Sequence, residues 1–98
     1  MSKKLRSAFT DDLDHCYFTG RPYPHIHHIF PGSRRKISEM YGYVIPLAAD
    51  LHEFQPESVH ENPNHGIDLH LKQMAQLHFE KNHGSREDFI QRFGKSWL

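Results

Sequence analysis

Two adjacent histidines, His27 and His28, stand in a β-prone segment that continues with Ile29 and Phe30. Side chains alternate along a strand, so the two imidazoles would lie on opposite faces. One ring can then bind a metal ion while its neighbour takes a proton from water, which metal-assisted hydrolysis of a phosphodiester requires. Ten histidines in 98 residues also produce such a pair by chance, so the dipeptide needs support from the rest of the chain.

Two further histidines follow at spacings that extend the pattern. His52 comes shortly after a second β-prone run, and His60 follows Val59. Together with His27 they are three neutral imidazoles, which leave coordination positions open for a phosphate oxygen and water. A closed structural site would use four ligands, usually thiolates, and the chain has one cysteine. Mn²⁺, Ni²⁺ and Zn²⁺ accept imidazole ligands better than Mg²⁺ does. We expect Mg²⁺ or Mn²⁺ to support turnover, and Zn²⁺ or Ni²⁺ to be found in crystals.

Composition sets limits on the class of protein. Ninety-eight residues make one small domain, and 12 basic residues balance 12 acidic ones, so there is no global basic field to attract nucleic acid. Phosphate contacts would have to come from a local patch, for which Arg34, Arg35 and Lys36 are the candidates. The lone cysteine excludes an internal disulfide. No apolar run approaches the ~18 residues of a membrane span and no signal peptide is visible, which predicts a cytoplasmic protein without membrane partners.

The apolar pattern predicts an α+β fold, in which a β-hairpin and a short helix are packed by two C-terminal helices. Residues 1–14 are polar and are expected to form a loose arm or a short helix. The spacing predicts these further elements: strands over 24–30 and 43–47, a short helix over 37–42, a short helix capped by Asp50, a long helix over 67–83 with a stripe widened by Leu77 and Phe79, and a last helix that Ser85 opens with a capping box and Gly94 ends.

The string His27-His28-Ile29-Phe30, followed by Val44–Leu47 and then His52, resembles the HNH motif, which is the ββα-metal (His-Me finger) core of many nucleases. Over residues 25–98 the chain is similar to small phage HNH proteins of the RecA-dependent recombination-enhancement nuclease type. The segments that carry this likeness are His27–Gly32, Arg35–Gly42, Val59–Asn62, Ala75–Glu80 and Phe93–Leu98. The resemblance implies a phage- or prophage-encoded, metal-dependent endonuclease that acts on DNA in a bacterial cell and leaves 5′-phosphate and 3′-hydroxyl ends.

The resemblance also implies roles for individual residues. His27 and His52 fill metal-ligand positions, His28 fills the general-base position, and His60 is a further ligand. The central asparagine position of the motif falls at Tyr43, which has no amide to hold the base. The resemblance therefore implies that the backbone or Asn62 takes over this supporting role.

The chain departs from many relatives in lacking a second zinc site made of Cys-x-x-Cys pairs. Cys16 stands where such a pair would begin, but Thr19 occupies the second position, so we expect this structural zinc to be absent. Two alternatives stay open: a catalytically degenerate finger that binds DNA or a protein, and a domain held by a histidine-bound structural zinc. A homodimer or a recombination or phage protein as partner is also open.

Other histidines and aromatic residues are assigned to less specific roles. His70 and His78 are expected at the surface or at the edge of the core, and His25 close enough on the strand to touch substrate. Phe93 and Trp97 are expected in the core rather than as platforms on which bases stack.

Overall fold

The computed structural model describes residues 5–52, 59 and 63–98. Strands β1 (His25–His28) and β2 (Val44–Leu47) form a two-stranded antiparallel sheet in which His27 lies opposite Ile45. Their connection holds the 3₁₀ turn η1 (Gly32–Arg34) and the helix α1 (Arg35–Met40). The predicted α+β class is thus confirmed.

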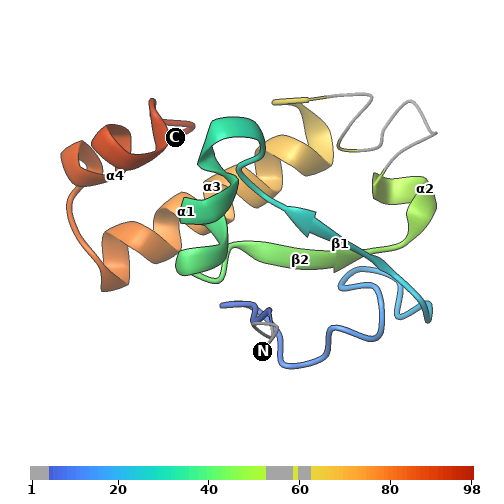
Figure 1. Cartoon of the computed structure of the whole chain (residues 1–98). Coiled ribbons are helices and arrows are strands. Elements are labelled where there is room, and N and C mark those ends of the chain that lie inside the picture. The colour runs from blue at the N-terminus through green and yellow to red at the C-terminus, as the bar shows by residue number, and fades with distance from the viewer. Residues whose placement is uncertain (1–4, 53–58, 60–62) are drawn as a thin grey trace.

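Three more helices follow the sheet. The short helix α2 (Ala49–His52) comes directly after β2, and the long α3 (Gly66–Asn82) and α4 (Arg86–Phe93) complete the chain. Figure 1 shows α1 and α2 at opposite ends of the hairpin, with α3 running along it and α4 near the C-terminal end of α3. One prediction was wrong in detail. Asp50 lies in the first turn of α2 and not before it, because the helix begins at Ala49.

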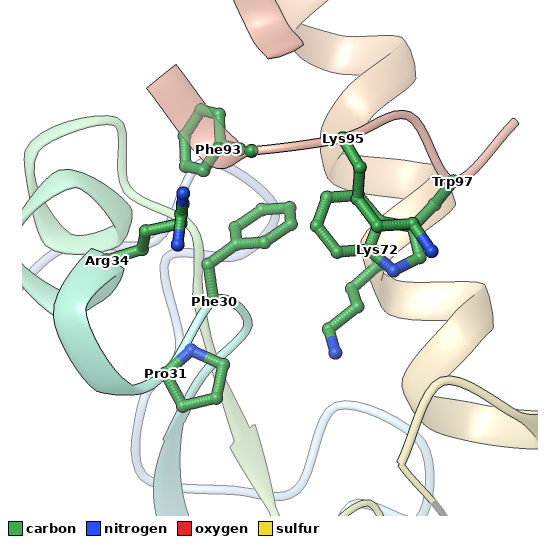
Figure 2. Close-up of a pocket in the computed structure, with 8 residues that line it drawn as sticks. Phe30, Pro31, Arg34, Lys72, Phe93, Lys95 and Trp97 are labelled. Carbon is green, nitrogen blue, oxygen red and sulfur yellow. The ribbon is translucent and has the colours of Figure 1, made fainter. Parts of the chain in front are cut away.

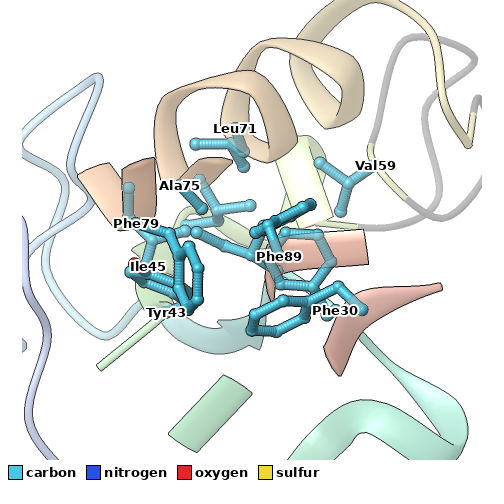
Figure 3. Close-up of a cluster of buried hydrophobic side chains, with 11 residues drawn as sticks. Phe30, Tyr43, Ile45, Val59, Leu71, Ala75, Phe79 and Phe89 are labelled. Carbon is cyan, nitrogen blue, oxygen red and sulfur yellow. The ribbon is translucent and has the colours of Figure 1, made fainter. Parts of the chain in front are cut away.

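The hydrophobic core joins the hairpin to the C-terminal helices, as the sequence pattern predicted. Figure 3 shows side chains of α3 facing aromatic residues of the hairpin and of α4. Phe30 packs against α4, with its ring centroid 4.4 Å from that of Phe93 and 5.7 Å from that of Phe89. Two strands alone are marginal in water, so this aromatic cover holds the hairpin in place. The fully or nearly fully buried members of this core are Ile29, Phe30, Tyr43, Ile45, Leu47, Val59, Leu71, Ala75, Phe79, Phe89 and Phe93.

Helix α3 buries two parallel stripes of residues, one apolar and one polar. Leu71, Ala75 and Phe79 form the apolar stripe, whereas Leu77, which was expected to widen it, is exposed. The polar stripe at Asp68, Lys72 and Gln76 is also buried. Residues four apart lie on one helix face, so each stripe is continuous, and the polar one is explained below by its hydrogen bonds.

Helix α4 begins with the capping box that the sequence predicted. The Ser85 side chain accepts a hydrogen bond from the Asp88 amide at 3.1 Å, and the Asp88 carboxylate accepts one from the Ser85 amide at 3.0 Å. Gly94 ends the helix with φ 96°, in the left-handed region. This conformation favours glycine because glycine has no Cβ.

Replacing Ser85 by alanine should lower the free energy of unfolding by about 1 kcal/mol, because one amide of the first turn loses its acceptor. Urea denaturation of the variant, compared with Ser33→Ala at an exposed position, measures this. Equal stabilities of the two variants would show that the cap does not contribute.

The described part of the N-terminal arm, residues 5–14, runs beside the hairpin without forming a helix. The Ala8 amide donates to the Gly42 carbonyl at 2.7 Å, and Phe9 packs against the core. Within the described ranges, no helix has both the length and the apolar character needed to cross a membrane.

Candidate functional site

The hairpin topology places the strand histidines near two different helices. Antiparallel pairing sets His25 opposite Leu47, just before α2, and sets His28 opposite Val44, just after α1. Helix α1 contacts β1, and α2 contacts both strands. His25 and His27 therefore share one face of the strand, with His25 at the end nearest α2, whereas His28 points to the other face.

A pocket of about 290 Å³ follows β1 and the turn after it. Its lining includes three of the four histidines that the sequence singled out, His27, His28 and His52, together with Arg35. Ile26, Pro31 and Gly32 complete the lining. Strand, turn and helix thus bring imidazoles and one guanidinium to a single cavity.

Three imidazoles lie close together on the α2 side of this pocket. The ring centroids of His27 and His52 are 5.2 Å apart, and Nδ1 of His25 lies 2.9 Å from Nδ1 of His52. His27 is buried, with 3% of its surface exposed. The pair of His25 and His52 was not anticipated, although the alternation of strand side chains puts His25 on the same face as His27.

The distance between the two Nδ1 atoms is compatible with two neighbouring metal ligands as well as with a hydrogen bond. Two nitrogen ligands at about 2.1 Å from one octahedral ion, at right angles, are about 3 Å apart. Within residues 5–52, 59 and 63–98, no three or more His, Cys, Asp and Glu side chains are arranged to hold a metal ion. Two imidazoles would leave most coordination positions of such an ion to water and phosphate oxygens, and imidazole is a ligand that Mn²⁺ accepts better than Mg²⁺ does.

His28 lies on the other side of the pocket, beside α1. Its Nε2 is 3.5 Å from the nearer carboxylate oxygen of Glu39, and 10% of the His28 side chain is exposed. This separation is longer than a hydrogen bond, and Nε2 has no hydrogen-bond partner in the described part of the chain. The Glu39 carboxylate therefore faces the His28 ring without a hydrogen bond to it. Glu39 belongs to the helix segment that carries the family likeness, but no role was predicted for it.

A buried polar network lies behind His27. Asp68 Oδ1 is 3.9 Å from His27 Nε2, and Asp68 Oδ2 accepts a hydrogen bond from Lys72 Nζ at 2.8 Å. The backbone amide of Asn64 donates to Asp68 Oδ2 at 2.6 Å, and Lys72 Nζ also donates to the side-chain Oδ1 of Asn64 at 2.7 Å. These bonds fix the Asp68 carboxylate near the imidazole, although its distance from Nε2 is beyond that of a hydrogen bond.

The three predicted phosphate contacts separate in the structure. Arg35 lines the histidine pocket, Arg34 lines a second pocket on the other side of Pro31, and exposed Lys36 lines neither of these two. Arg34 and Arg35 therefore belong to two different cavities. They separate because η1 and α1 turn successive side chains in different directions.

Tyr43 does not reach the histidine pocket. It is fully buried, and its hydroxyl lies 3.0 Å from Nδ1 of His78. Burial raises the Tyr43 pKa far above its ordinary value of 10.0, so the phenol stays neutral and structural. His60 and Asn62, the other predicted ligand and support, lie outside the described residues.

The partner of Tyr43 gives a pH dependence of stability. Burial, and secondarily the charges of His83 and Lys81, hold the pKa of His78 below its ordinary value of 6.5. The stabilising contribution of neutral His78 is therefore fully present above pH 6.5 and is lost as the pH falls from there through the lowered pKa. Urea denaturation should show a smaller acid loss for His78→Gln than for the parent chain. Equal losses would contradict this assignment.

Comparison of the chain with protein-family models, with curated protein sequences and with solved structures found no match.

Proposed function

We propose that the chain is a metal-dependent endonuclease of the HNH type, which hydrolyses phosphodiester bonds in DNA, and that β1, β2 and α2 are its ββα-metal core. The observation that carries the proposal is the single pocket lined by His27, His28, His52 and Arg35. This lining supports the proposal because it combines histidines that could bind a metal ion or take a proton with an arginine that could bind a phosphate. A nuclease of this kind needs these groups together.

His28 is the group that removes the proton from the attacking water. It must be neutral to do so, and activity should therefore fall at acidic pH. The Glu39 carboxylate, 3.5 Å from Nε2, can accept a hydrogen bond from the protonated ring after a small movement of either side chain. Arg35 can hold a non-bridging phosphate oxygen at the mouth of the same pocket.

The β1 imidazoles and His52 are the residues that would hold the divalent ion. When bound, this ion supplies stabilisation of the negative charge that develops on the phosphoryl and leaving oxygens. The Asp68 carboxylate lies 3.9 Å from the His27 ring, and Lys72 holds Asp68 in place. Acidic side chains thus lie beside both strand histidines, Glu39 beside His28 and Asp68 beside His27.

A second candidate function is a degenerate finger that binds DNA or a protein without cutting it. The burial of Tyr43 favours this alternative, since the side chain at the motif's asparagine position is turned into the core and cannot hold the base. Glu39 would have to replace that support for catalysis to persist.

A plasmid assay distinguishes the nuclease from the non-cleaving finger. Supercoiled plasmid is incubated with the protein in Mn²⁺ or Mg²⁺, and in EDTA as a control. The nuclease proposal predicts nicked or linear plasmid with the cation and intact plasmid with EDTA. Binding of DNA in a mobility-shift assay without any cation-dependent cleavage would refute the nuclease proposal and support the degenerate finger.

A further inference from the structure

A second pocket, of about 330 Å³, lies on the other side of Pro31 from the histidine pocket. Figure 2 shows side chains from three parts of the chain around it: Arg34 from the turn after β1, Lys72 from α3, and Lys95 with Trp97 from the segment after α4. Phe30, Pro31, Phe93 and Gly94 complete the lining. The lining is therefore aromatic and cationic, and it includes no carboxylate.

Two of the three cations are available to a ligand. Lys72 is already bound to Asp68, but no described carboxylate pairs with Arg34 or Lys95. Arg34 Nε is buried and has no hydrogen-bond partner among the described residues. A Cβ at position 94 would lie 2.6 Å from Arg34 Nη2, so Gly94 is what lets the guanidinium enter this space. A buried, positively charged hydrogen-bond donor that has no partner favours the binding of an anionic ligand.

Trp97 is half-buried and held in a fixed orientation. Its amide donates to Gln76 Oε1 at 2.8 Å, its carbonyl accepts from Gln73 Nε2 at 2.8 Å, and its indole N–H donates to Asn64 Oδ1 at 3.2 Å. These bonds account for the burial of Gln76 on the polar stripe of α3. Lys95 Nζ lies 5.6 Å from the ring centroid. Lys72 Nζ also lies over the ring, 5.5 Å from its centroid. A fixed indole with two lysines over it brings an aromatic surface and cationic phosphate contacts together.

We propose that this second pocket binds one unpaired nucleotide of a DNA strand, with its base against Trp97 and its phosphate at Arg34 and Lys95. Both pockets are lined by Pro31, so the two adjoin, and a strand bound in the histidine pocket can reach this one. The inference rests on the proposed nuclease function, and it names the substrate feature: an unpaired nucleotide beside the scissile phosphate. A base inside a duplex is covered on both faces by its neighbours, whereas an unpaired base can be splayed out and stacked on an aromatic side chain.

Binding is measured in EDTA, so the result does not depend on cleavage. Trp97 is the only tryptophan, and its fluorescence reports directly on this pocket. A short single-stranded oligodeoxyadenylate should quench it. The same strand built of abasic nucleotides keeps its phosphates and should not quench, and neither should a blunt duplex. Equal quenching by the abasic strand, or none by the oligodeoxyadenylate, would overturn the proposal.

Variants test the two halves of the ligand separately, with anisotropy of a labelled single strand as the readout. Trp97→Leu should weaken binding by about 5- to 150-fold, and Trp97→Phe by less, because a ring is kept. Lys95→Ala should reduce the slope of log affinity against log salt by about 0.7. Lys81→Ala, which removes an exposed charge at the far end of α3, should leave both unchanged. If Lys95→Ala and Lys81→Ala behave alike, the phosphate contact is refuted. Failure of plasmid nicking with normal quenching would instead refute only the nuclease activity.

Discussion

Replacing His28 by alanine should lower the rate of cation-dependent plasmid cleavage by about 10²- to 10⁴-fold, because the attacking water loses its general base. The fold should survive, since His28 is not part of the hydrophobic core. The rate is measured with enzyme in excess over plasmid, and circular dichroism checks the fold.

His70→Ala is the matched control for this variant, because it removes an exposed imidazole from α3. It should cut at the parent rate. Glu39→Gln should give a loss smaller than that of His28→Ala, since it removes the carboxylate beside the base and not the base itself. A His28→Ala protein that cuts as fast as the parent would show that the catalytic assignment is wrong.

Replacing Asp68 by alanine should destabilise the protein by about 3–5 kcal/mol, because it leaves the buried Lys72 ammonium without its counter-charge. The side chains of Asp68 and Lys72 are only 4% and 8% exposed. A domain of this size has a free energy of unfolding of about 5–15 kcal/mol, so this is a large share. Urea denaturation measures the loss.

A double variant distinguishes a buried ion pair from a simple packing defect. Asp68→Ala combined with Lys72→Met should be more stable than Asp68→Ala alone, because the uncompensated charge is gone. Breaking the more exposed pair of Arg86 and Glu80 by Arg86→Ala should cost much less. If the double variant is less stable than the single one, the charge account is refuted.

The sequence was sufficient to predict the type and order of the elements. Period-two and period-3.6 patterns and turn residues mark the strands and the long helix, and Ser85 with Gly94 marks both ends of α4. These patterns depend on neighbouring residues in the sequence, so contacts between distant segments do not change what they predict. The exposure of Leu77 was missed because apolar spacing alone does not show where the buried face of α3 ends. The buried stripe at Asp68, Lys72 and Gln76 was missed because such residues are normally exposed unless they are paired, and their partners lie elsewhere in the chain.

The candidate site was predicted less completely than the fold. Strand alternation correctly separates the faces of His27 and His28, but it does not show which helix meets each face. The meeting of His25 with His52, and of His28 with Glu39, depends on α2 and α1 closing opposite ends of the hairpin. The motif's central asparagine position falls at Tyr43, and the side chain there faces the core because it shares a face with Ile45.

The central idea is that imidazoles of β1 and α2 share one divalent ion beside His28. A crystal structure with Mn²⁺, located by the anomalous signal of the metal, tests this idea most directly. We expect an anomalous peak in the histidine pocket, bonded to the imidazole of His52 and to that of His25 or His27. At a Mn²⁺ concentration that saturates plasmid cleavage, an empty pocket, or a peak elsewhere on the protein only, would contradict this account.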